Sequence, residues 1–156
     1  MRWLYPLLIV CSAGCTSPTP TGTVCPTPDP QTLTYDNFGK PFMDRYCTWC
    51  HDSSLPHSKR NGAPLYHDFD SLVGVLEVPD HIDEQAGFGP DAQNKFMPGQ
   101  RCPSVKGGAL DTNCAQPTPE ERTNLAMWIA CERHRTHTFG ADAGVDAAAD
   151  AGADAP

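Results

Sequence analysis

Two cysteines and a histidine in the stretch RYCTWCHD, residues 45–52, have types and a spacing suited to chemistry. Two residues separate Cys47 from Cys50, and His51 directly follows the second cysteine. Three kinds of site use such a CxxC pair: a redox dithiol, half of a zinc site, and the attachment site of a c-type haem. In the third, both sulfurs form thioethers to the porphyrin and the adjoining histidine binds the iron.

The rest of the chain favours the haem interpretation of this motif. A structural zinc site needs four ligands, usually from two such pairs, and the sequence has no second CxxC. A thioredoxin-like pair would follow a strand in a βαβ unit, whereas the residues around the motif have helical spacing. We therefore expect one haem c per chain, bound covalently through Cys47 and Cys50, with His51 as an axial iron ligand.

A second axial ligand is expected from a methionine, because electron-transfer haems of this kind use a thioether opposite the histidine. Met1 lies in the N-terminal apolar segment, and Met43 precedes Cys47 on the same expected helix. Met127 lies midway along another expected helix, where a core or surface role is the better interpretation. Met97, in the Gly/Pro-rich stretch NKFMPGQ, is the expected ligand because a loop can cross the distal face.

Histidines are the rival distal ligands. His57, His67 and His81 all lie between the CxxCH motif and Met97 in the sequence. Ligation by two histidines, or a distal site left open, would change the chemistry of the iron. These alternatives stay open at the level of sequence.

The N-terminus is typical of a bacterial export signal. Arg2 supplies the positive charge, and residues 3–11 form an apolar segment too short to span a membrane as a mature helix. Ala13, Gly14 and Cys15 resemble the lipobox of bacterial lipoproteins, although Ser12 stands where that motif usually has leucine. We expect a signal peptide at 1–14, lipidation of Cys15, and a location at the periplasmic face of a membrane; a soluble periplasmic protein is the alternative.

Composition divides the mature chain into three parts. Residues 15–32 are rich in threonine and proline and are expected to form an extended tether. Residues 33–138 are expected to form the domain, and the Ala/Asp-rich residues 139–156 a disordered tail. The formal net charge of −8 argues against a nucleic-acid partner, because phosphate binding relies on Lys and Arg.

Apolar spacing predicts helices over residues 40–50 and 70–76, with Pro79 ending or restarting the second. The last helix has the clearest start: Thr118 as N-cap, Pro119 in the first turn and Glu121 to complete a capping box. Because no segment shows sustained period-two alternation, the predicted fold class is all-α, with long loops.

Four cysteines remain after Cys11, Cys15 and the motif pair are set aside: Cys25, Cys102, Cys114 and Cys131. An even number in an oxidising compartment indicates disulfides, for which three pairings exist. We favour Cys102 with Cys114, which closes a short loop after Met97, and therefore Cys25 with Cys131.

Together these stretches resemble class I cytochrome c over residues 34–135. GKPFMDRYCTWCH, beginning at Gly39, is similar to that family's N-terminal helix, FMPG to its Met-Pro loop, and ERTNLAMWIAC to its C-terminal helix. The resemblance implies a cytochrome c-like fold in which Gly39 meets Trp128 where the terminal helices cross. It also implies an electron carrier that serves redox partner proteins and is not an enzyme. The alternative is a haem enzyme or gas-binding protein whose distal site is open or histidine-ligated.

Overall fold

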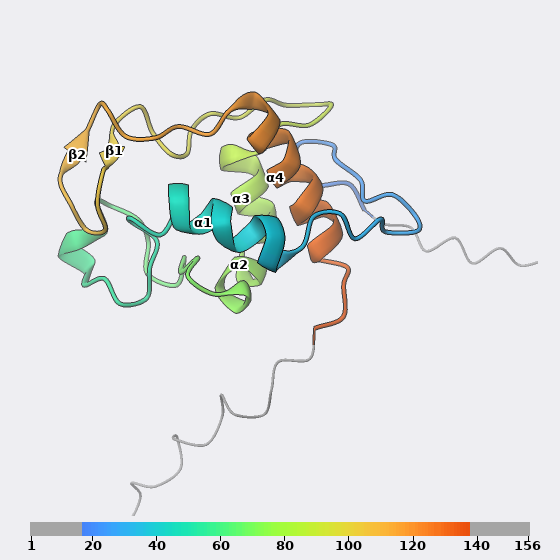
Figure 1. Ribbon diagram of the computed structural model, residues 1–156, viewed down its shortest axis with the longest axis horizontal. Coiled ribbons are helices and arrows are strands. Elements are labelled where there is room, and N and C mark those ends of the chain that lie inside the picture. The colour runs from blue at the N-terminus through green and yellow to red at the C-terminus, as the bar shows by residue number, and fades with distance from the viewer. Residues whose placement is uncertain (1–16, 138–156) are drawn as a thin grey trace, which may run out of the picture.

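The structure is a computed structural model that describes residues 17–137. The expected signal peptide at 1–14, the expected lipidation site Cys15 and the expected tail at 139–156 lie outside the described residues. The elements, shown in Figure 1, are a π-helical turn η1 (Tyr35–Gly39), α1 (Lys40–Tyr46), a 3₁₀ turn η2 (His57–Lys59), α2 (Leu72–Glu77), α3 (Pro79–Ala86), β1 (Cys102–Pro103), β2 (Leu110–Asp111) and α4 (Pro119–Glu132).

The predicted fold class, an all-α cytochrome c-like domain, is wrong, because the structure combines helices with a two-stranded sheet and much loop. Strands β1 and β2 are antiparallel, with Cys102 opposite Asp111 and Pro103 opposite Leu110. Each strand has two residues, too few to produce the alternation by which strands are recognised in sequence. Figure 1 shows this hairpin at the opposite end of the molecule from the first described residues, which are drawn in blue.

The local sequence signals predict where the helices lie more accurately than they predict the residues at which the helices begin and end. The capping box of α4 is confirmed: the Glu121 N–H donates to Thr118 Oγ1 at 3.1 Å, and the Thr118 N–H donates to Glu121 Oε2 at 2.8 Å. The middle helix begins at Leu72, two residues later than predicted, because Ser71 caps it by accepting from the Gly74 N–H. Pro79 opens a separate helix, α3.

Helix α1 ends at Tyr46, whereas the prediction extended it to Cys50. The residues after it form a tight turn in which the His51 N–H donates to the Cys47 carbonyl at 2.9 Å. Cys47, Cys50 and His51 of this turn line one pocket together with residues of α1 and α3.

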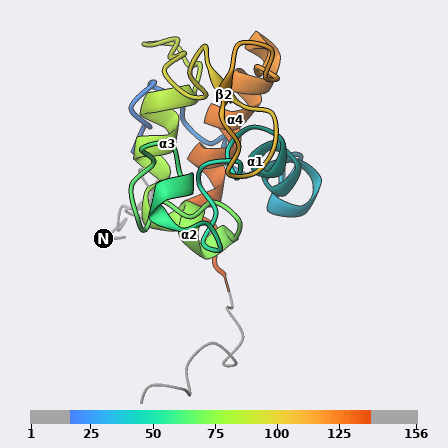
Figure 2. The same ribbon diagram turned by 90° about the vertical axis from the view of Figure 1, so that its left-hand side faces the viewer.

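The hydrophobic core joins α1, α3 and α4, and Figures 1 and 2 both show α3 lying beside α4. Leu125, Trp128 and Ile129 of α4 are fully buried against α1 and α3. Gly39, the last residue of η1 and the N-cap of α1, approaches Trp128 so closely that a Cβ at residue 39 would lie no more than 2.7 Å from three ring atoms. The resemblance to class I cytochrome c implies this contact, and the structure contains it.

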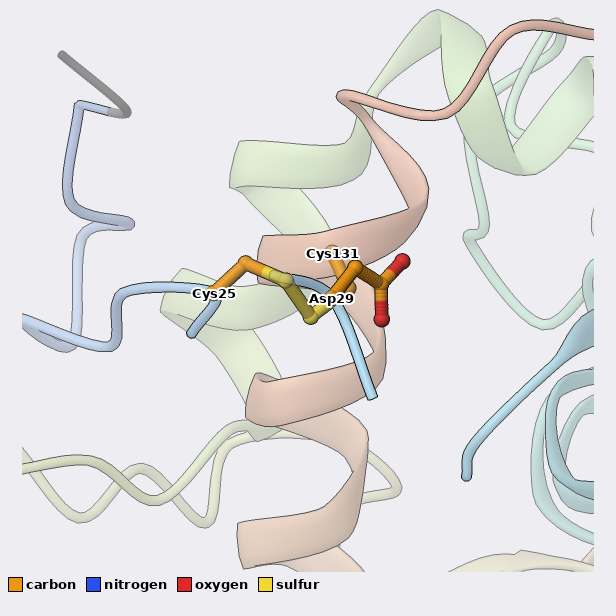
Figure 3. A group of neighbouring side chains, drawn as sticks. All are labelled: Cys25, Asp29 and Cys131. Atoms are coloured by element: carbon orange, nitrogen blue, oxygen red, sulfur yellow. A yellow bond between two sulfur atoms is a disulfide. The ribbon is translucent and has the colours of Figure 1, made fainter. Parts of the chain in front are cut away.

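Residues 17–32, expected to be part of an extended tether, instead form an N-terminal strap against α3 and α4. Thr21 is fully buried, and its N–H and Oγ1 donate to Asp83 at 2.8 and 3.0 Å. Cys25 forms a disulfide with Cys131, shown in Figure 3. Composition predicts chain stiffness but not docking, because these contacts join residues far apart in sequence.

Candidate functional site

The CxxCH residues line one pocket of about 260 Å³. Cys47 and Cys50 are free thiols, whereas the other four cysteines among residues 17–137 are paired in disulfides. The pocket also gathers side chains from α1, α3, the loop before α2, the Met97 loop and the β-hairpin. Its lining includes Phe42, Tyr46, Cys47, Trp49, Cys50, His51, His67, Phe69, His81, Ile82, Gln85, Ala86, Phe96, Met97, Pro98 and Leu110.

His51 is oriented by a backbone carbonyl. Its Nδ1 lies 3.0 Å from the carbonyl oxygen of His67, which can only accept, so Nδ1 carries the proton and Nε2 is left to bind a metal. The ring stacks on Phe69, with the centroids 4.6 Å apart. Burial lowers the pKa of His51 to about 4, which keeps the imidazole in the neutral form that metals bind.

The two thiols differ from a reactive dithiol in their electrostatic surroundings. Burial raises the pKa of Cys47 to about 12 and also raises the pKa of Cys50. A catalytic CxxC pair depends on a lowered pKa that stabilises a thiolate. These surroundings therefore favour protonated thiols in the pocket.

Met97 lies in the same pocket, on the segment after α3. Its N–H donates to the Gln85 carbonyl at 3.0 Å, and its own carbonyl accepts from Arg122 Nη1 at 2.8 Å. Met97 is 48% exposed. By contrast, Met43 is fully buried in the core, and Met127 packs beside the Cys25–Cys131 disulfide.

Two of the three rival histidines share the pocket, and the third does not. His67 and His81 both line it, with ring centroids 5.1 Å apart. His57 lies in the exposed turn η2 outside the lining. His67 also supplies the carbonyl that orients His51, so this part of its backbone lies beside His51.

Sequence reasoning missed two buried arginines at the edges of this site. Arg122, on α4, donates through Nη1 to the carbonyls of Ala86, Asn94 and Met97, and is 3% exposed. A signal existed for it, because Arg122 shares the helical stripe of Leu125. Arg60 is 1% exposed and lies in a loop without periodicity, where the sequence carried no signal.

Both favoured disulfides are present. Cys102 pairs with Cys114, which links β1 to the segment after β2, and Cys25 pairs with Cys131. The latter lies beside Asp29 and a larger pocket of about 600 Å³, as Figure 3 shows for the three side chains. Metal ligation by cysteine requires a thiolate, so the disulfide removes two of the three ligands that this cluster would offer.

Comparison with protein-family models, curated proteins and solved structures finds no match to this chain. Among residues 17–137, no helix is both long enough and apolar enough to cross a membrane. Evidence for function therefore comes from the chemistry of the site itself.

Proposed function

We propose that this protein is a monohaem c-type cytochrome that carries electrons. Cys47 and Cys50 would attach the porphyrin, and His51 and Met97 would bind the iron. One observation carries this proposal: two unpaired thiols share an apolar pocket with an oriented, neutral histidine, in a chain whose other described cysteines are oxidised.

The donor set fits a haem better than a zinc ion. Zinc favours four nitrogen or sulfur ligands in a closed tetrahedral site. Cys47, Cys50, His51, His67 and His81 all line the pocket, but among residues 17–137 no three of their ligand atoms lie close enough together to share one ion. Phe42, Phe69 and other apolar side chains line much of the rest. Apolar walls leave a bare ion unsolvated, but they suit the faces of a porphyrin.

A bound haem would supply a one-electron Fe(III)/Fe(II) couple. The residues of this chain would hold and tune it. The His67 carbonyl keeps His51 in the tautomer that presents Nε2, and Arg122 fixes the backbone of Met97. Apolar side chains such as Phe42 and Phe69 exclude water from the pocket.

The proposal extends to location and partners. The resemblance to class I cytochrome c is supported by the contact between Gly39 and Trp128. The N-terminal residues favour export and lipidation at Cys15, which would tether the protein to the periplasmic face of a bacterial membrane. Its partners would be redox proteins, and no catalytic role of its own is proposed.

A second candidate function is a haem enzyme or gas-binding protein with an open or histidine-ligated distal site. It is favoured by the 48% exposure of Met97, which leaves this residue less confined than a fixed ligand. His67 and His81 in the same pocket are the alternative ligands.

The haem proposal is tested by production with a working cytochrome-maturation apparatus. We expect haem that stays on the polypeptide through a denaturing gel, and its loss in the double variant Cys47→Ser/Cys50→Ser. The control variant Cys25→Ser/Cys131→Ser removes two sulfurs that form a disulfide outside this pocket, and it should retain the haem. A colourless wild-type product with the mass of the bare polypeptide, plus any lipid, would refute the proposal.

The distal ligand is tested by the near-infrared sulfur-to-iron charge-transfer band of the ferric protein. We expect this band in the wild type and in Met127→Ala, whose side chain packs beside the distant Cys25–Cys131 disulfide. It should be absent in Met97→Ala. A wild-type protein that lacks the band and readily binds carbon monoxide would instead support the second candidate function.

A further inference from the structure

Arg60 is the most extensively bonded side chain in the loop between the CxxCH motif and α2. It is 1% exposed and donates five hydrogen bonds, all to atoms of this loop. Four acceptors are backbone carbonyls, those of Asp52, Ala63, Pro64 and His67, and the fifth is Asp68 Oδ1 at 2.7 Å. Only a guanidinium offers five donors in one rigid plane, so one side chain organises the whole loop.

One of these carbonyls also belongs to the candidate haem site. The His67 oxygen accepts from Arg60 Nη2 at 3.0 Å and from His51 Nδ1 at 3.0 Å. Two donors therefore share one acceptor, and one of them is a permanent cation. Polarisation of the carbonyl by Arg60 reduces the electron density available to the imidazole N–H.

We propose that Arg60 is a positioning residue for His51, which fixes the shared His67 carbonyl and weakens its hydrogen bond to the imidazole. This inference rests on the proposed function, because its consequence is a change in the reduction potential of the haem iron. A weaker bond at Nδ1 gives the imidazole less anionic character, which favours the ferrous state and raises the reduction potential. Arg60 therefore tunes the haem through the His67 carbonyl that it shares with His51.

The carboxylate of Asp68 opposes this effect. It accepts from the same Nη1 atom of Arg60 that donates to the Asp52 carbonyl, and partly neutralises the guanidinium. Loss of the Asp68 charge should therefore strengthen the pull of Arg60 on the shared carbonyl. Loss of the Arg60 charge should do the reverse, so the two substitutions have opposite expected signs.

The experiment measures the His51 Nδ1–H proton by nuclear magnetic resonance in the reduced haem protein, together with the reduction potential. In Arg60→Gln the Nδ1–H resonance should move downfield, as expected for a stronger hydrogen bond. The reduction potential should fall, because a stronger hydrogen bond at Nδ1 shifts the equilibrium toward the ferric form.

A second pair of variants decides the question if Arg60→Gln does not fold. Asp68→Asn should move the Nδ1–H resonance upfield and raise the potential. Asp70→Asn removes the same charge from the same loop, but Asp70 accepts hydrogen bonds from Ser53 and makes none with Arg60. In this variant the His51 Nδ1–H resonance should therefore stay in place.

Equal resonance shifts in the two aspartate variants, or none in either, would overturn the role of Arg60. If the role of Arg60 were purely structural, Arg60→Gln would lower the free energy of unfolding and leave the Nδ1–H resonance in place. Absence of haem from the wild-type protein is a different result, since it refutes the proposed function.

Discussion

The close packing of Gly39, the last residue of η1, against α4 can be tested by adding one methyl group. In Gly39→Ala the new Cβ would lie 2.6 and 2.7 Å from Cε2 and Cη2 of Trp128, whereas carbon atoms in favourable contact are about 3.5–4.0 Å apart. The ring has little room to move, because Trp128 is fully buried and its Nε1 donates to Glu132 Oε2 at 2.7 Å.

The expected magnitude follows from two opposing effects. Overpacking of a filled core destabilises by about 1–3 kcal/mol, and three short contacts with one ring place this site near the upper end. Alanine offsets up to about 1 kcal/mol of this, because it is the better helix former. We therefore expect Gly39→Ala to lower the free energy of unfolding by about 2 kcal/mol, roughly a 30-fold change in the folding equilibrium.

Denaturant unfolding at equilibrium provides the assay, with Gly99→Ala as the matched control. A Cβ at residue 99 would meet its nearest atom at 3.6 Å, an ordinary contact, so this variant should stay within about 0.5 kcal/mol of the wild type. Shortening the ring with Trp128→Phe should relieve the clash, so the two substitutions should not be additive. Equal stability of the Gly39→Ala and Gly99→Ala proteins, or additivity with Trp128→Phe, would refute the packing argument.

Two further predictions concern stability. Cys102→Ser/Cys114→Ser should lower the free energy of unfolding by about 3 kcal/mol, as expected for a loop of this length, and a loss under 0.5 kcal/mol would show that the hairpin is held by other contacts. Two hydrogen bonds from Arg135 hold the pKa of Asp29 below its usual 3.8. A carboxyl group whose pKa is lowered in the folded state stabilises the fold only while it is ionised. The contribution of Asp29 to the free energy of unfolding is therefore fully present above pH 3.8 and is lost as pH falls through the native pKa. The free energy of unfolding, measured from pH 5 downward, should therefore fall more steeply below about pH 4 in the wild type than in Asp29→Asn. Parallel plots of this free energy against pH for the two proteins would contradict the ion-pair interpretation.

Several features of this protein can be predicted from the sequence because they depend only on residues close together in the chain. The CxxCH spacing places both thiols and His51 on one turn whatever the rest of the chain does. The capping box at Thr118 is equally local, since its two hydrogen bonds join residues three apart. Elimination among the four methionines predicts Met97 as the distal ligand, and Met97 lines the pocket.

Tertiary structure alone decided what surrounds these residues. Arg60 donates to four backbone carbonyls, and the oxygen that orients His51 is also the backbone carbonyl of His67. Every residue has such an oxygen, so no residue type in the sequence marks these acceptors. The N-terminal strap reads as a spacer by composition, yet Thr21 is buried against Asp83, a partner 62 residues away. Sequence by itself determined which residues could do chemistry, because motif spacing and helix caps are short-range. Only the folded chain decided which carbonyls, cations and apolar walls meet them, because such contacts depend on long-range packing that no local pattern encodes.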